Sequence, residues 1–172
     1  DDDGADPARL DGPGIRGVGA AFVTPAHQYP TGTTLSPARR AALARWARMV
    51  DGYVVEDDYD GELRYDRQPV GALQAIDPDR VVYVGTASKS LAPGLRLGWM
   101  ALPAPLAEPI TLAKELADRQ SGVIDQLALG ELITSGGLDR HLRRARLRYR
   151  RRRDELVAAL ATVPAVRARG IA

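Results

Sequence analysis

The stretch "YVGTASKSLAPGLRLGWM" (residues 83–100) runs from an apolar strand into a turn rich in Ser, Gly and Pro, and it carries a lysine. Of the 24 Lys and Arg residues in the chain, only Lys89 and Lys114 are lysines. A lysine amine can lose its proton and attack a carbonyl to form a Schiff base, whereas a guanidinium cannot. Taken alone, Lys89 fits an ordinary surface lysine better than a reactive amine, so its role depends on the residues around it.

Apolar runs on both sides of this stretch predict further strands. Residues 19–25, 52–58, 80–86 and 95–103 each have the composition and length of a short strand. Between the first two, residues 36–50 begin with Ser-Pro, which is typical of a helix N-terminus. Residues 60–79 are expected to be a polar connection with one turn of helix.

The helix over 36–50 is expected to be amphipathic, because Leu43, Trp46, Ala47 and Val50 recur at helical spacing. Strand, helix, strand, connection and strand in this order predict an α/β fold with a mostly parallel sheet and flanking helices. In such sheets, ligands bind beyond the carboxyl ends of the strands.

The C-terminal half is predicted to be helical over 106–119, 122–135 and 138–162, with the first two helices packing on the core. Nine arginines fall between residues 140 and 153. Such a cluster can bind a nucleic-acid backbone. A broken apolar stripe through the same residues favours the alternative, a long helix with a solvated basic face.

Candidate chemical groups follow the second and third predicted strands. Asp57 and Tyr59 are two residues apart, so they point to the same side of an extended chain, and Asp58 points to the other. Thr86, Ser88 and Arg96 surround Lys89 with two hydroxyls and one guanidinium, which suit a phosphate. Pro93-Gly94 is expected to turn the chain so that Arg96 returns toward Lys89.

These groups match the needs of pyridoxal phosphate: an amine for its aldehyde, an acid for its ring nitrogen, a donor for its phenolic oxygen and an anion site. "SKSLAPGLRLGW" (88–99), "EDDYDGELRY" (56–65) and "HQYPTG" (27–32) together resemble the large domain of fold-type-I pyridoxal-phosphate enzymes, the aspartate-aminotransferase superfamily, over about residues 15–160. The resemblance implies that Lys89 is the Schiff-base residue and that Arg96 binds the phosphate, with Thr86 and Ser88 beside it. It further implies that Asp57 binds the ring nitrogen and Tyr59 the phenolic oxygen.

One departure from ordinary aminotransferases indicates a particular subfamily. Those enzymes place Asn before Pro-Thr-Gly, where this chain has Tyr29. The pair "VTPAHQYPTG" and "EDDYDGELRYDRQP" is similar instead to the MocR subfamily of GntR-type bacterial transcription regulators, in which an aminotransferase-like domain follows a winged-helix DNA-binding domain. The resemblance implies an amine or amino-acid ligand, DNA binding through a winged helix outside this segment, and a homodimer. A working aminotransferase and a segment that does not bind the cofactor remain as alternatives.

Composition sets the remaining expectations. The chain has no cysteine, and its two histidines, His27 and His141, lie far apart, so neither a thiolate site nor a metal site is expected. We assign His27 no catalytic role. No apolar run has the length of a membrane span, and we expect a cytoplasmic protein. The chain is interpreted as an internal piece of a longer protein, with residues 1–135 in a partial cofactor-binding large domain and 136–172 leading into a small domain.

Overall fold

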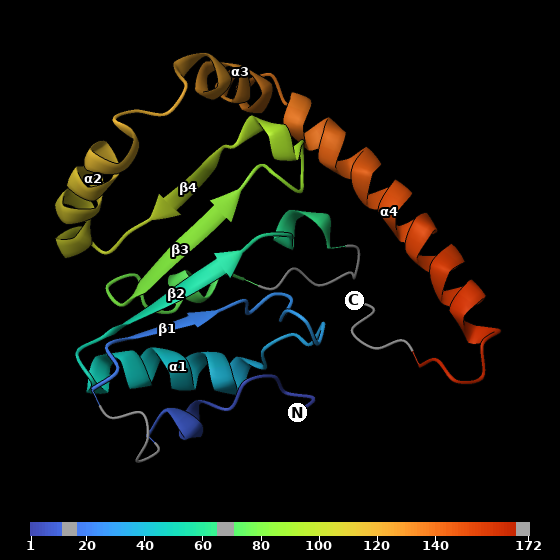
Figure 1. Cartoon of the computed structure of the whole chain (residues 1–172), viewed down its shortest axis with the longest axis horizontal. Helices are drawn as coiled ribbons and strands as arrows, with labels where there is room; N and C mark the ends of the chain where they lie inside the picture. The colour runs from blue at the N-terminus through green and yellow to red at the C-terminus, as the bar shows by residue number, and fades with distance from the viewer. Residues whose placement is uncertain (12–16, 65–70, 168–172) are drawn as a thin grey trace.

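The computed structural model describes residues 1–11, 17–64 and 71–167, and its centre is a four-stranded sheet. The strands β1 (Ala20–Val23), β2 (Tyr53–Asp58), β3 (Val81–Thr86) and β4 (Gly98–Ala101) lie in this order across the sheet. β1, β2 and β3 are parallel, whereas β4 is antiparallel to β3 (Figure 1). The predicted α/β fold with a mostly parallel sheet is therefore confirmed.

One face of the sheet is covered by α1 (Pro37–Met49), which lies beside β1 and β2 (Figure 1). Leu43 and Trp46 of α1 are each 2% exposed, and they pack in one cluster with Val54 of β2 and Val81 of β3. The prediction that Val50 belongs to the helix and its apolar face was wrong: α1 ends at Met49, and Val50 is 40% exposed.

The alternation of side chains along β2 separates the core from the opposite face. Val54 and Glu56 point toward α1 and are buried, so Asp57 points to the other face and is open to solvent. The buried Glu56 accepts hydrogen bonds from the backbone N–H groups of Leu73 (2.8 Å) and Gln74 (2.9 Å). This side chain thereby fixes the connection before β3 to the core side of the sheet.

The connections contain short 3-10 turns. One, Gly61–Leu63, follows β2 and another, Leu73–Ala75, precedes β3; the intervening residues 65–70 of the predicted polar connection lie outside the described residues. A third turn spans Pro93–Leu95, and β4 starts only at Gly98, so the predicted strand over 95–103 was too long. The turn-forming Pro-Gly pair and the left-handed backbone of Arg96 (φ 50°) explain this late start.

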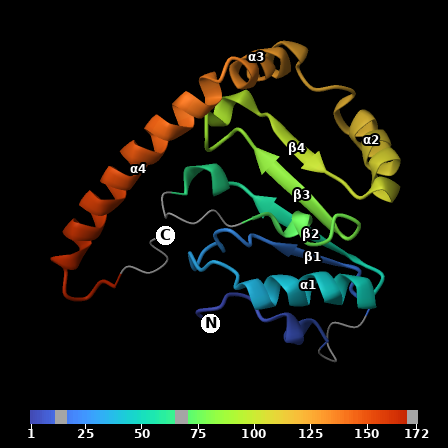
Figure 2. The same ribbon diagram turned by 180° about the vertical axis from the view of Figure 1, so that it is seen from behind.

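The helices α2 (Ala104–Asp118), α3 (Val123–Thr134) and α4 (Gly137–Ala161) follow one another in an arc beyond β4 (Figures 1 and 2). The expected core packing of the first two was wrong for the described residues, in which neither α2 nor α3 has a buried side chain. Leu116 of α2 is 80% exposed and Ile124 of α3 is 82% exposed. An apolar stripe shows that a helix favours burial, but it does not show which surface covers it.

None of the helices in the described parts of the chain combines the length and the apolar character needed to cross a bilayer.

Candidate functional site

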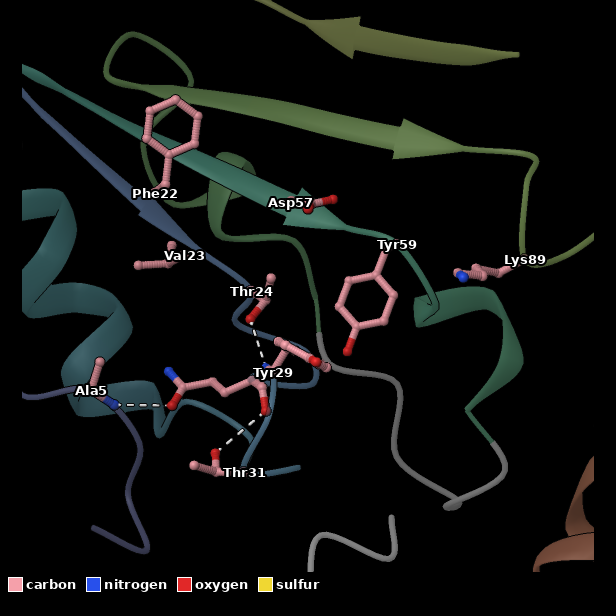
Figure 3. Close-up of a pocket in the computed structure, with 10 residues that line it drawn as sticks. Ala5, Phe22, Val23, Thr24, Tyr29, Thr31, Asp57, Tyr59 and Lys89 are labelled. Carbon is pink, nitrogen blue, oxygen red and sulfur yellow. Dashed lines mark hydrogen bonds between the residues drawn. The ribbon is translucent and has the colours of Figure 1, made fainter. Parts of the chain in front are cut away.

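A pocket of about 620 Å³ lies at the carboxyl ends of the parallel strands (Figure 3). This volume is within the range of small-molecule sites, roughly 300–1,000 Å³. Its lining comes from the N-terminal segment, from β1 and the loop after it, and from the ends of β2 and β3: Ala5, Phe22, Val23, Thr24, Gln28, Tyr29, Thr31, Asp57, Tyr59 and Lys89. Three of the residues predicted from the sequence, Asp57, Tyr59 and Lys89, are thus brought to one cavity.

The geometry of the parallel strands explains this convergence. β2 and β3 run side by side with Asp57 paired to Val84, so the ends of both strands reach the same edge of the sheet. Asp57 and Tyr59 extend from the end of β2, and Lys89 extends from the segment after β3 toward Tyr59 (Figure 3). Their arrival at one edge follows from the parallel direction of the strands.

Asp58, between the two pocket residues, points elsewhere. Its Oδ2 accepts a 3.0 Å hydrogen bond from the Tyr83 hydroxyl, and its Oδ1 accepts one from the backbone N–H of Gly61. The first bond links the end of β2 to β3, and the second holds the turn that follows β2. The prediction that Asp57 and Tyr59 share one side and Asp58 takes the other is confirmed.

Asp57 carries a carboxylate in unfavourable surroundings. Although the side chain reaches solvent, the surrounding protein removes part of its hydration, which raises its pKa above the ordinary value, and the neighbouring carboxylates of Asp58 and Asp60 raise the pKa further. A cation placed against Asp57 would offset both effects, because an opposite charge favours the ionised acid. The acid is therefore suited to a positively charged ligand group.

Tyr59 is held by the loop that follows β1. Its hydroxyl donates a 3.0 Å hydrogen bond to the backbone carbonyl of His27, and the two rings stack with centroids 6.3 Å apart. The His27 ring is held in turn by Asp60, with 2.7 Å between Nδ1 and Oδ2. Burial, followed by the charges of Asp60 and Asp57, raises the pKa of Tyr59, so the phenol stays protonated at neutral pH.

The predicted phosphate residues lie near Lys89 but are not among the lining residues. The Thr86 hydroxyl accepts a 3.1 Å hydrogen bond from the Ser88 backbone and lies 3.0 Å from the Ser88 hydroxyl. These contacts shape the turn that carries Lys89. Arg96 follows the turn Pro93–Leu95 and is exposed. Phosphate contacts by Thr86, Ser88 and Arg96 stay predictions.

Sequence reasoning missed the part played by the loop after β1. Thr24, Gln28 and Tyr29 line the pocket. The backbone N–H of Tyr29 donates a 3.3 Å hydrogen bond to the Thr24 hydroxyl. The signal available in the sequence was their position directly after a parallel strand, where ligands bind. His27, to which we assigned no catalytic role, contacts Tyr59 through its backbone carbonyl and its ring.

The residues present fit pyridoxal phosphate. One pocket holds an exposed primary amine, a carboxylate whose raised pKa calls for a cationic partner, and a protonated phenol. The protonated ring nitrogen of pyridoxal phosphate is such a cation, and the aldehyde group on that ring reacts with amines. Lys89, Asp57 and Tyr59 would hold these parts of the cofactor.

Comparison with known proteins gives a family match and several similar proteins. The family model of aminotransferase class I and II matches residues 20–170. Among solved structures, a kynurenine aminotransferase from Pyrococcus horikoshii is similar, with a TM-score of 0.79 and 36% identity over 84% of this chain and 36% of that one. The family implies pyridoxal phosphate as the cofactor.

Several similar proteins are transcriptional regulators. The helix-turn-helix regulator YhdI of Bacillus subtilis is 42% identical over 140 residues, covering 81% of this chain and 30% of the relative. The pyridoxine biosynthesis regulator PdxR of Corynebacterium glutamicum is 38% identical, and the match covers 90% of this chain and 34% of PdxR. The probable rhizopine catabolism regulatory protein MocR of Rhizobium meliloti is 37% identical, and the match covers 80% of this chain and 28% of MocR.

The predicted resemblance to MocR-type regulators is thus confirmed, although the chain spans only about a third of the length of these relatives. The family match extends over most of the chain, from β1 past the end of α4. The chain belongs to the aminotransferase class I and II family.

Proposed function

We propose that this chain is the cofactor-binding part of a bacterial MocR-type transcription regulator, which senses pyridoxal phosphate together with an amine or amino acid. The observation that carries the proposal is the meeting of Lys89, Asp57 and Tyr59 at one pocket, in a chain similar to three regulators. When bound, pyridoxal phosphate supplies an aldehyde for amines and a protonated ring that withdraws electrons.

Each pocket residue has a defined task in this proposal. Lys89 would bind the cofactor's aldehyde through its side-chain amine, with loss of water. Asp57 would hold the ring nitrogen, and its negative charge would favour a proton on that nitrogen. Tyr59, which lines the same pocket, would contact the phenolic oxygen. Thr86, Ser88 and Arg96 are proposed to bind the phosphate.

The organisation of the whole protein is also part of the proposal. Residues 1–135 would form part of the large domain, and 136–172 would lead into the small domain. DNA would be bound by a winged-helix domain outside this segment, in a cytoplasmic homodimer. The similarity to helix-turn-helix regulators such as PdxR supports the DNA-binding part of this arrangement.

A working aminotransferase is the second candidate, and the similarity to the kynurenine aminotransferase favours it. Lys89 would then also move a proton at the substrate Cα. A segment without cofactor binding is the third candidate, which a direct binding measurement addresses.

Two assays on the full-length gene product separate the candidates. One measures DNA binding upstream of its own gene with and without pyridoxal phosphate and added amines. The other follows amino-group transfer from a panel of amino acids to 2-oxoglutarate. The proposal expects cofactor-dependent DNA binding without repeated turnover. Repeated turnover without any DNA binding would contradict it and support the enzyme.

A further inference from the structure

α4 contacts both chain segments that carry the polar groups of the pocket. The His141 Nε2–H donates a 2.8 Å hydrogen bond to the backbone carbonyl of Ser90, the residue directly after Lys89. Little more than one turn further along the helix, Arg146 Nε donates a 2.5 Å hydrogen bond to the backbone carbonyl of Glu62, three residues after Tyr59. One short section of α4 therefore contacts the segments that follow β3 and β2.

The two segments are also joined to each other beneath the helix. The Glu62 side chain makes a hydrogen bond with Ser90, which opposes the upward shift that burial causes in the pKa of Glu62. Ser90 is 5% exposed. His141, Ser90, Glu62 and Arg146 thus form a continuous link, in which Ser90 is buried and the other three residues are partly buried.

Burial on α4 is confined to the same section. Leu142 is 8% exposed and Ala145 is 2% exposed, and they are the buried residues of α4 in the described structure. Beyond them, Leu147 is 71% exposed and Leu156 is 59% exposed. A helix of 25 residues is roughly 37 Å long. Its first half therefore contacts the segments that carry Lys89 and Tyr59, whereas its second half extends away from these contacts.

We propose that His141 and Arg146 are positioning residues that set Lys89 relative to Asp57 and Tyr59, and that they couple occupation of the pocket to the position of α4. Arg146 thereby differs from the exposed arginines of the same helix, such as Arg151, which pairs with Glu155 four residues along. The identity of the occupant rests on the proposed function, whereas the link itself rests on the contacts above.

The test compares His141→Phe, His141→Gln and the control Arg151→Ala in the full-length gene product. Phe keeps a ring of similar size but has no donor for the Ser90 carbonyl, whereas Gln places an N–H near the position of Nε2. The first readout is amide hydrogen exchange in residues 87–91 and 60–63 without cofactor. We expect roughly 3- to 10-fold faster exchange in His141→Phe, as for one lost hydrogen bond, and near-normal exchange in the other two.

The second readout is the visible circular dichroism of bound pyridoxal phosphate, which reports how the chromophore is held. His141→Phe should change the band, and His141→Gln should restore it. Unchanged exchange in residues 87–91, or faster exchange confined to α4, would overturn the proposal. Should His141→Phe fail to fold, Arg146→Leu tests the other contact of the link: faster exchange is expected in residues 60–63 together with a changed band, and unchanged exchange there would overturn the proposal.

The two readouts also separate this inference from the proposed function. Hydrogen exchange is measured without cofactor, so it tests the link even in a protein that binds none. If the wild-type protein does not bind pyridoxal phosphate, the proposed function is contradicted. The conclusion from hydrogen exchange about the link is then unaffected.

Discussion

The Tyr59 hydroxyl donates its hydrogen to the backbone carbonyl of His27, 3.0 Å away, although the same ring lines the pocket. A phenol has one hydrogen to donate. A donor role toward a ligand oxygen therefore requires Tyr59 to exchange one acceptor for another when the ligand binds. The loop after β1, which carries both His27 and Tyr29, is consequently tied to the state of the pocket.

Tyr59→Phe should lower the free energy of unfolding by about 0.5–1.5 kcal/mol, the usual contribution of one hydrogen bond. It should also shift the absorption maximum of bound cofactor, since a donor near the phenolic oxygen is lost. Denaturant titration and visible spectroscopy measure the two effects. Tyr53→Phe is a matched control, because it keeps the ring that Arg80 contacts. Equal results for the two variants would contradict the role of the Tyr59 hydroxyl.

Asp57→Asn should weaken cofactor retention and, at the same time, stabilise the cofactor-free protein at neutral pH. The folded state raises the pKa of Asp57, so the native protein binds more protons than the unfolded chain. Its stability must then fall as pH rises from the ordinary aspartate value through the raised pKa. Asn has no such titration, so the stability difference between variant and wild type should grow with pH over that interval.

Thermal melts of both cofactor-free proteins between pH 3.5 and pH 8 provide the measurement. Asp79→Asn is the control, because the Asp79 side chain is 80% exposed. A difference between Asp57→Asn and wild type that stays constant with pH would contradict the electrostatic account of this site.

Glu56→Ala should destabilise the protein strongly, by about 3–5 kcal/mol, because it leaves buried charge and backbone donors without a partner. Glu56 is 2% exposed, accepts two backbone hydrogen bonds and lies 3.7 Å from the buried Arg40. Glu56→Gln keeps one acceptor and should cost less. Denaturant unfolding measures both, and a loss below 1 kcal/mol in the Ala variant would show that the connection before β3 is held by other contacts.

Leu43→Ala should cost about 2–5 kcal/mol, the range for truncating a buried leucine. Leu43 is 2% exposed in the cluster between α1 and the sheet. Arg45→Ala, on the exposed side of the same helix, should change stability by less than about 0.5 kcal/mol. Similar losses in the two variants would argue against the packing of α1 described above.

Local sequence patterns were enough to predict the sheet, α1 and the three later helices, because apolar spacing and the Ser36-Pro37 start depend on neighbouring residues alone. The meeting of Asp57 and Lys89 followed from one further rule, that parallel strands end at one edge. Contacts between distant segments could not be predicted this way. Tyr59 and His27 are 32 residues apart, and His141 and Ser90 are 51 apart.

The exposure of α2 and α3 marks another limit of sequence patterns. Their apolar residues predict helices correctly, but the surface that covers a helix depends on the tertiary arrangement. The position of Arg96 could not be predicted either. Its own left-handed backbone, directly after Pro93–Leu95, redirects the chain before β4, and side-chain composition does not reveal this.

The most direct test of the account is the site at which the full-length protein binds pyridoxal phosphate covalently. Reduction with borohydride fixes a Schiff base, and peptide mass mapping then locates it. Lys114 provides an internal comparison, because it is the second lysine of the chain and pairs with Asp118 on α2, 2.9 Å away. We predict a phosphopyridoxyl group on Lys89 alone. A label on Lys114, or no label on this chain, would contradict the assignment of the pocket.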